Sequence, residues 1–336
     1  MRYVRKIQFT GKSTFIVSLP KKWVLEHKLS TGSQVVIEEN GPVLTIKPFS
    51  QIETKDQRIA PITIKGDEDP ETVARRVIGA YIINYDKIVI KSQVSIPPAI
   101  RNTLRRTILN KLPGAEIINE DKQEIHIQVL LNSRNVTVED ALRRLTRVVN
   151  SVIEDTCSTL EKKDISLAQE VVKEDDSIDR IFFYITRLFN QVARGFIEVE
   201  NEINFTDLLV YRSLAKLLER IGDHAINVAQ NALNLMGTNI ELKDIYNLCR
   251  DALGIFSNSV EAIMSRNPYI VDEVGFKTEI LRKKEEQLFS FYLNKLQPDQ
   301  LVSLRLILES IRRIAEYSRD ISELALDLGL EKILKN

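Results

Sequence analysis

The carboxyl-terminal region, residues 135–336, constrains the fold most, because helical periodicity dominates it and strand signals nearly vanish. Thr137-Val138-Glu139-Asp140 has the form of a capping box, which predicts a long helix from there to about Lys163. Proline-containing breaks at Asn267-Pro268 and Gln297-Pro298-Asp299 separate the later stretches. The other predicted helices cover about residues 166–198, 206–236, 241–266, 270–296 and 299–328. We therefore expect six helices in two tandem three-helix bundles, about 135–237 and 238–330.

An internal repeat supports this division into two bundles. Residues 218–227 read LERIGDHAIN, and residues 311–320 read IRRIAEYSRD, with apolar and polar positions in the same order. Each segment falls in the third helix of its predicted bundle. The repeat therefore predicts two copies of one supersecondary unit.

Pairs of carboxylates occur at helical spacing in the first bundle. On a helical projection, Glu219 and Asp223 lie opposite the apolar row of their helix, and Asp175 and Asp179 repeat the spacing on the preceding helix. If the two helices pack side by side, four carboxylates meet on one outer face. Such oxygen donors suit hard cations, iron or manganese. The same spacing is also common on solvated helices, so the residues alone leave both interpretations open.

Residues 51–134 predict a separate small α/β domain. Strand and helix signals between residues 61 and 131 follow the order β-α-β-α-β-β, and no glycine-rich phosphate loop accompanies them. Arg101, Arg105 and Arg106 form a basic helix face, which we interpret as solvated surface in preference to an anion site. This segment by itself indicates no function.

Residues 1–50 predict two β-hairpins around a short helix. The expected strands are 3–9, 15–17, 35–37 and 43–46, and the helix begins after Pro20. A unit of this size buries too little apolar surface to be stable alone. We therefore expect its sheet to be completed by a second chain, which makes the protein a homodimer.

Charge is distributed unevenly, although 47 basic and 47 acidic residues cancel overall. Residues 1–50 carry a net charge of +5, residues 51–134 carry +2, and residues 135–336 carry −7. A basic head on an acidic body favours contact between the head and a polyanion such as double-stranded DNA. Arg5 is the best candidate for reading guanine, whereas Lys21 and Lys22 also fit a solvated helix start. The candidate phosphate contacts are Arg2, Arg5, Lys6, Lys12, Lys21 and Lys22.

Other classes of protein are disfavoured. No apolar stretch approaches the roughly 18 residues that span a bilayer, and the basic start lacks the apolar core of a secretory signal. Cys157 and Cys249 are too few for a disulfide framework or a thiolate zinc site. His27, His126 and His224 are scattered, and no nucleophile or phosphate loop accompanies the acidic pairs. We expect a cytoplasmic protein without membrane insertion and without catalytic residues.

The head resembles the AbrB/SpoVT (MazE-like) swapped-hairpin domain. The stretch RKIQFTGKSTFIVSLPKKWVLEHKLSTGSQVVIEENGPVLTIKP shows its order of a basic strand, T-x-G, a strand ending in LPK, a helix, G-x-x-V and a final hairpin. The resemblance covers nearly all of residues 1–48. It implies an intertwined dimeric β-barrel that lays basic strands and loops on DNA.

The helical half resembles the PhoU family, through KEDDSIDR followed by LLERIGDHAINVAQ. The resemblance spans about residues 137–330 and implies repeated bundles whose Asp/Glu-x-x-x-Asp motifs hold metal ions. Asp175, Asp179, Glu219 and Asp223 occupy those motif positions. The implied cofactor is a divalent or trivalent ion of iron, manganese, magnesium or zinc. The fold as a whole is then a multidomain α+β protein.

The second bundle departs from this pattern. Arg312 replaces the equivalent of Glu219, and Glu316 replaces that of Asp223. The earlier helix offers either Thr278 and Arg282 or Arg282 and Glu286 at the other two positions. A guanidinium cannot coordinate a cation, but it can pair with a carboxylate at i+4. We therefore expect a metal at the first bundle only and salt bridges in its place at the second.

A MazE-like head on a PhoU-like body resembles archaeal regulators of phosphate uptake. The resemblance implies a DNA-binding regulator whose body reports phosphate status through a metal, phosphate or a partner such as the transporter's ATPase. One alternative is an adaptor that restrains a phosphate ABC transporter and uses its head only to dimerise. A weaker alternative is a metallophosphatase-like enzyme.

Overall fold

The computed structural model describes residues 2–11, 14–49, 57–131, 137–194, 205–238 and 240–334. The chain divides into two compact units, Met1–Arg58 and Ile59–Asn336, which are described separately below. The first is the basic head. The second contains both the α/β domain and the helical body.

The head consists of two antiparallel hairpins and one short helix. Gln8 pairs with Ile16 in the first hairpin, and Val35 pairs with Pro48 in the second. The first strand begins at Gln8, later than the predicted start at Tyr3, because its partner strand offers pairing positions only to residues 8–10. The elements are β1 (Gln8–Thr10), β2 (Thr14–Ile16), α1 (Lys21–Glu26), β3 (Val35–Asn40) and β4 (Val43–Pro48).

A single copy of the head leaves its apolar side chains exposed to solvent. Phe9 and Phe15 contact each other across the first hairpin, with ring centroids 5.1 Å apart, yet 60% and 71% of their surfaces stay accessible. Ile7, Ile37 and Leu44 are exposed to a similar degree. This exposure favours completion of the sheet by a second chain. The swapped-hairpin barrel itself stays a prediction.

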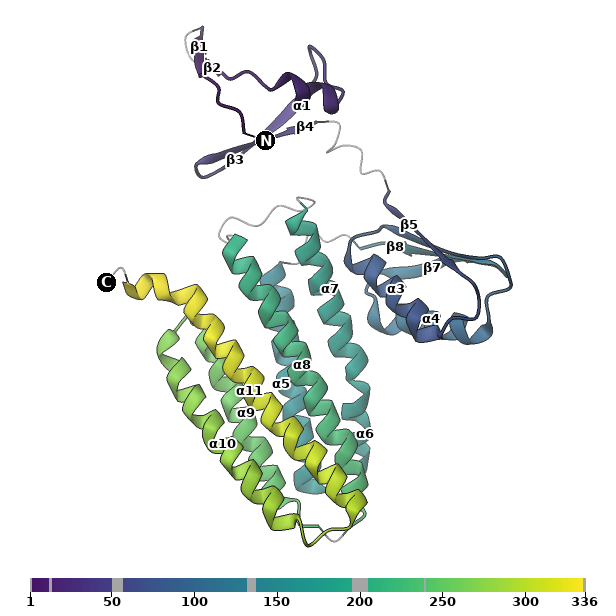
Figure 1. The fold of residues 1–336 in the computed structure, drawn as a ribbon, viewed down its shortest axis with the longest axis vertical. Helices are drawn as coiled ribbons and strands as arrows, with labels where there is room; N and C mark the ends of the chain where they lie inside the picture. The colour runs from purple at the N-terminus through teal and green to yellow at the C-terminus, as the bar shows by residue number, and fades with distance from the viewer. Residues whose placement is uncertain are drawn as a thin grey trace. The chain divides into compact units, whose positions relative to one another are not determined.

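The α/β domain has the predicted order β-α-β-α-β-β. Its sheet runs β5-β6-β8-β7, with β5 parallel to β6 and the other neighbours antiparallel. The two helices pack side by side against the sheet (Figure 1), burying Val77, Tyr81 and Leu104. The elements are β5 (Ile59–Ile64), α3 (Pro70–Ile82), β6 (Lys87–Ser92), α4 (Pro98–Lys111), β7 (Ala115–Glu120) and β8 (Glu124–Val129).

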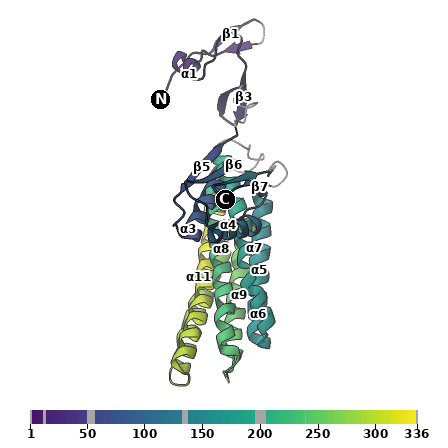
Figure 2. The same ribbon diagram turned by 90° about the vertical axis from the view of Figure 1, so that its right-hand side faces the viewer.

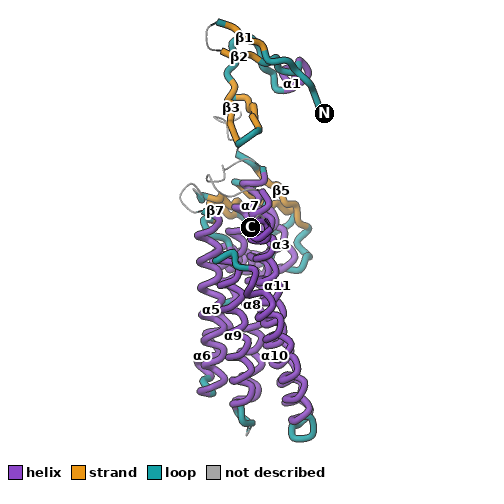
Figure 3. The backbone as a smooth tube through the Cα atoms, turned by 90° about the vertical axis from the view of Figure 1, so that its left-hand side faces the viewer, coloured by secondary structure: helices purple, strands orange, loops and turns teal. Residues whose placement is uncertain are grey.

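The body consists of long helices that run along one another (Figure 2), and its described residues form no strand (Figure 3). Thr137 caps the start of the first of these helices as predicted, since its side chain accepts a hydrogen bond from the Asp140 amide at 3.0 Å. Among the described residues, no helix is both long and apolar enough to cross a membrane. The elements are α5 (Val138–Lys162), α6 (Ile165–Lys173), α7 (Asp175–Ala193), α8 (Phe205–Met236), α9 (Lys243–Met264), η2 (Pro268–Ile270), α10 (Val271–Tyr292) and α11 (Pro298–Leu334).

One predicted helix is in fact two. The expected helix over 166–198 is interrupted at Glu174, where α6 ends and α7 begins. Asp175 and Asp176 occupy the first turn of α7, where carboxylates interact favourably with the positive end of the helix dipole. The three successive acidic residues Glu174, Asp175 and Asp176 are therefore more favourable at the start of a helix than in its interior. The predicted end of this helix, at residue 198, lies outside the described residues.

The two bundles are joined into a single hydrophobic core along α8 and α11. A polar seam accompanies this contact, in which Asn227 donates to Ser310 at 2.9 Å and Asn234 donates to Ser303 at 3.3 Å. Cys157 on α5 and Cys249 on α9 form a disulfide between the bundles. Two cysteines were too few to predict a disulfide framework, and this single bridge depends on a tertiary contact that their spacing does not reveal.

Candidate functional site

The four predicted metal ligands come from α7 and α8, which pack together as expected. Gly222 allows the close approach, because a Cβ atom at this position would lie 2.5 Å from Cδ1 of Ile178. Ile178 precedes Asp179, and Gly222 precedes Asp223, so the contact brings the acidic motifs to the same side of the bundle. The charges of Asp175 and Glu219 consequently act on Asp179, and the charges of all three act on Asp223.

A lysine from the α/β domain forms ion pairs with three carboxylates on α7. Nζ of Lys111, the last residue of α4, lies 2.7 Å from Asp179 Oδ2, 3.1 Å from Asp175 Oδ2 and 3.2 Å from Asp176 Oδ1. We call Asp175, Asp176 and Asp179 the carboxylate row. Its internal counter-ion is therefore supplied from another domain.

The row and its lysine are partly dehydrated. Burial by itself lowers the pKa of Lys111, but the hydrogen bonds and charges of Asp179 and Asp175 outweigh burial and raise it, so the ammonium stays charged. Burial raises the pKa of Asp179, and Lys111 opposes that rise. The attraction between Lys111 and Asp179 thus has to offset the free-energy cost of removing both charges from water.

Glu219 has a different lysine. Lys216, one turn earlier on α8, donates to both carboxylate oxygens at 2.7 and 2.6 Å, and its Nζ lies 5.0 Å from the ring centroid of Phe182. Glu219 is buried, with 8% of its surface exposed. An ordinary helical ion pair therefore neutralises this carboxylate.

Asp223 is the member of the predicted set without a cation of its own. It forms no ion pair with any residue in the described ranges. Although its side chain reaches solvent, burial by the surrounding atoms and then the charges of Glu219, Asp179 and Asp175 raise the pKa of Asp223 to about 7. Asp223 is therefore the carboxylate of this site whose negative charge is not balanced by a lysine.

The arrangement does not offer a metal ion an open set of donors. Across the described parts of the chain, no three or more His, Cys, Asp or Glu side chains are grouped so that they could hold a metal. Lys111 and Lys216 take up the carboxylate oxygens that a cation would use. The metal at the first bundle, whether iron, manganese, magnesium or zinc, stays a prediction.

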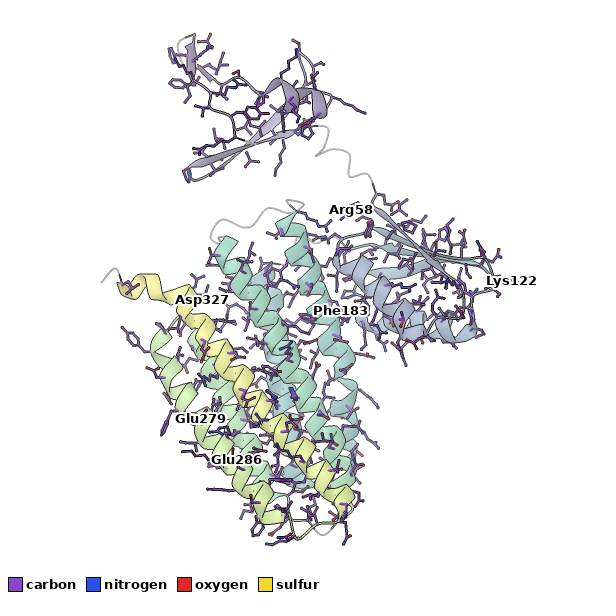
Figure 4. The ribbon with its side chains drawn as sticks, viewed as in Figure 1. Arg58, Lys122, Phe183, Glu279, Glu286 and Asp327 are labelled. Carbon is purple, nitrogen blue, oxygen red and sulfur yellow. A yellow bond between two sulfur atoms is a disulfide. The ribbon has the colours of Figure 1, made fainter. Side chains whose placement is uncertain are left out.

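The second bundle contains the salt bridge expected in place of a metal. Arg312 donates to Glu316 at i+4, and its Nε lies 3.8 Å from the buried carboxylate of Glu285. The Arg282 guanidinium is 3.1 Å from Glu279 and 3.1 Å from Glu286. Both glutamates lie on α10 (Figure 4). Arginines thus supply the positive charge at this bundle.

The DNA-contact candidates in the head are exposed wherever the structure describes them. Lys22 lies 3.8 Å from Glu26, and the Arg5 guanidinium lies 5.8 Å from the ring centroid of Tyr3. Lys12 lies outside the described residues. DNA contact stays a prediction for the whole set, and the exposed members are Arg2, Arg5, Lys6, Lys21 and Lys22.

The basic face of α4 is neutralised by neighbouring carboxylates. Arg101 and Arg105 bind the two oxygens of Glu120 at 2.6 and 2.8 Å, and Arg106 binds Glu71 at 2.7 Å. These pairs agree with the interpretation of this face as structural surface in preference to an anion site.

Sequence reasoning missed the residues that attach the α/β domain to α7. Lys111 stands in the last turn of a helix, a common place for a basic residue. Arg180 and Arg187 stand in an amphipathic helix with no distinguishing motif. Their partners lie in another domain, so no local signal could have identified them.

Two family models match the chain. The model described as "PhoU domain" matches residues 142–232, and that described as "Antidote-toxin recognition MazE, bacterial antitoxin" matches residues 8–53. The body is PhoU-like, and the head is MazE-like. The PhoU match includes all four predicted metal ligands.

Curated relatives and a solved structure agree with this description of the body. The chain is 25% identical over 218 residues to a phosphate-specific transport system accessory protein PhoU homolog of Clostridium acetobutylicum, covering 62% of this chain and 92% of that protein. A homolog of the same name from Pseudomonas putida is 26% identical over 235 residues, covering 63% and 85%. The PhoU crystal structure from Streptococcus pneumoniae superposes with a TM-score of 0.51 at 16% identity, covering 56% of this chain and 91% of that one. At this level of identity, the similarity to the solved structure shows a shared fold.

Proposed function

We propose that this chain is a cytoplasmic, homodimeric regulator of phosphate uptake whose MazE-like head binds double-stranded DNA and whose PhoU-like body responds to phosphate status. The observation that carries the proposal is the union of the two domain types in one chain. Relatives that align over most of their length with this chain are named as accessory proteins of phosphate-specific transport. The proposal assigns the chain no catalytic role.

The charge distribution supports DNA binding by the head. Residues 1–50 carry a net charge of +5, whereas residues 135–336 carry −7. The described basic candidates of the head are exposed, so their charges are accessible to a ligand. Lysine and arginine side chains on such a surface neutralise phosphates and release counterions.

Exposed apolar residues support a dimeric head. Phe9, Phe15 and Ile37 each expose more than half of their surface in a single copy. Burying such side chains against a second copy supplies the driving force for association. A two-fold dimer would also present two equivalent sets of basic side chains to the two halves of a DNA site.

The first test is DNA affinity measured as a function of salt concentration. The double variant Arg5→Ala/Lys6→Ala removes two candidate phosphate contacts, and Lys65→Ala/Lys122→Ala removes two exposed lysines from the α/β domain. We expect the wild type and the control to share one steep slope of log affinity against log salt. Because a dimer carries each contact twice, the head variant should lose about 3.6 from that slope, about 0.9 for each of four phosphate contacts. Sequencing the DNA that co-purifies with the protein, with and without phosphate, would identify the site.

An adaptor that restrains a phosphate transporter is the second candidate. The observation in its favour is that the relatives are named for the transport system and align with the body. Absent DNA binding, or DNA binding equally affected by both double variants, would favour this function. Co-purification with the transporter's ATPase would then be the informative assay, with the head serving only to dimerise.

A further inference from the structure

We propose that Lys111 is the resident cation of the carboxylate row, and that the row serves to dock the α/β domain on α7 where the PhoU resemblance implies a metal ion. The inference does not depend on DNA binding or on phosphate control. It rests on contacts between two domains of one compact unit.

The hydrogen-bonding capacity of Lys111 matches the row. A lysine ammonium has three N–H donors and no acceptor. Nζ donates to Asp179 at 2.7 Å and to Asp175 at 3.1 Å, and Asp176 Oδ1 lies 3.2 Å away as a third ion-pair partner. Asn110, the preceding residue, donates its side-chain amide to Asp176 at 2.7 Å. The end of α4 is thus bound by two adjacent side chains.

The backbone at the end of α4 is held by α7 as well. The last carbonyls of a helix have no partner within the helix and carry the negative end of its dipole. Arg180 donates to the carbonyls of Leu109 at 2.6 Å and Asn110 at 3.4 Å. An arginine therefore caps this helix end from the neighbouring domain, one residue after the carboxylate row ends.

The same arrangement recurs two turns further along α7. Arg187 donates to the carbonyl of Tyr81, near the end of α3, and to that of Tyr85 at 3.2 Å. Phe183 lies between the two arginines, at the boundary between α7 and the α/β domain (Figure 4), and packs against the cores of both. The face of α7 toward the α/β domain consists of the carboxylate row, Arg180, Phe183 and Arg187. This face is a docking surface in which the row has a structural role.

The charge balance explains why a lysine and a metal ion exclude each other here. An ion coordinated by the row would stand where the ammonium now lies, and like charges a few ångströms apart repel strongly. The side chain of Lys111 is 25% exposed and that of Asp179 is 19% exposed, so solvent screens this repulsion only in part. Removing the lysine charge would leave three carboxylates together on one helix turn. Such a group attracts hard cations.

The test compares Lys111→Gln with Lys122→Gln. Both variants lose one lysine charge from the α/β domain, but Lys122 is an exposed turn residue at the end of the sheet away from α7 (Figure 4). Manganese binding is measured by titration of the full chain. We expect weak and equal affinity in the wild type and Lys122→Gln, and affinity tighter by about tenfold or more in Lys111→Gln. Equal affinity in all three proteins would overturn the proposal.

Amide hydrogen exchange provides the second readout. The amides of residues 108–112 should exchange about tenfold faster in Lys111→Gln than in Lys122→Gln, because the end of α4 loses its anchor. Unchanged exchange would overturn the docking role. Should Lys111→Gln fail to fold, Asp179→Asn tests the same claim. Faster exchange at residues 108–112 with unchanged metal content would support the proposal, and a loss of bound metal from the wild-type level would overturn it.

Discussion

The guanidinium group of Arg187 lies 4.9 Å from the ring centroid of Tyr81 and also donates a hydrogen bond to the main-chain carbonyl of that residue. Arg187 is 4% exposed, and Tyr81 is fully buried. The charged side chain of Arg187, which belongs to the body, is therefore buried against the end of α3 in the α/β domain.

This contact predicts a large loss of stability on truncation. Arg187→Ala leaves the carbonyls of Tyr81 and Tyr85 without this donor and opens a cavity, so the free energy of unfolding should fall by about 2–4 kcal/mol. Arg187→Lys should recover only part of it, because an ammonium lacks the planar fork. Urea denaturation is the measurement. The control, Arg144→Ala at an exposed position of α5, should stay within about 0.5 kcal/mol of the wild type. Equal effects at both positions would contradict the anchoring role.

The Cys157–Cys249 bridge predicts a dependence of stability on reductant. The two residues are separated by 92 positions, their Cα atoms lie 5.7 Å apart, and both are buried. Constraining so long a segment of the unfolded chain corresponds to about 4–5 kcal/mol in the chain-entropy model. Denaturation with and without reductant should show this difference. The double variant Cys157→Ala/Cys249→Ala should be insensitive to reductant. Two titratable thiols per denatured chain, in protein prepared without reductant, would show that the bridge does not form.

The ion pairs of Glu120 predict a loss of stability in acid. Burial alone raises the pKa of Glu120, but the hydrogen bonds and charges of Arg105 and Arg101 outweigh it and lower the pKa below the usual 4.5. The folded state therefore binds the proton less readily than the unfolded chain. The stabilisation that ionised Glu120 contributes is complete above about pH 4.5. It disappears as the pH falls through the lowered pKa of Glu120 in the folded state.

Glu120→Gln tests this linkage. At pH 7 the variant should be less stable than the wild type by about 1–2 kcal/mol, and the difference should shrink as the pH falls below about 4.5. Thermal or urea unfolding across this range is the measurement. Glu116→Gln, at an exposed position of the same strand, should change stability by less than about 0.5 kcal/mol. A difference that grows in acid would reverse the assigned sign.

The exposed aromatic pair of the head predicts which residues form the interface of the proposed dimer. Phe15→Asp places a charge where a second copy is expected to bury a ring, so the dimer should weaken by about 2–4 kcal/mol. Light scattering over a concentration series measures the effect. Ile118→Asp makes a similar change at an apolar residue of β7 that is 52% exposed, and it should leave the dimer intact. A Phe15→Asp protein as dimeric as the wild type would exclude this surface as the interface.

Much of the fold could be predicted because its signals are local. The capping hydrogen bond of Thr137 joins residues three positions apart, and the helix it begins ends within one residue of the expected Lys163. The β-α-β-α-β-β order of the α/β domain follows from alternation and proline positions in the same way. The break at Glu174 was missed because helical periodicity continues across it. The late start of β1 was missed because strand residues are defined by their partners.

For the candidate site, too, local features could be predicted from the sequence, whereas contacts between domains could not. Periodicity alone placed Asp175 with Asp179 and Glu219 with Asp223, because a helix brings residues four apart to one face. Which cation meets these carboxylates is decided by packing. Lys111 reaches Asp175 and Asp179 across 64 and 68 positions of sequence, and Cys157 reaches Cys249 across 92. Periodicity and capping act over a single helix turn, so the sequence expresses them directly. A counter-ion or a disulfide partner depends on where whole domains dock, and that is determined only once the chain has folded.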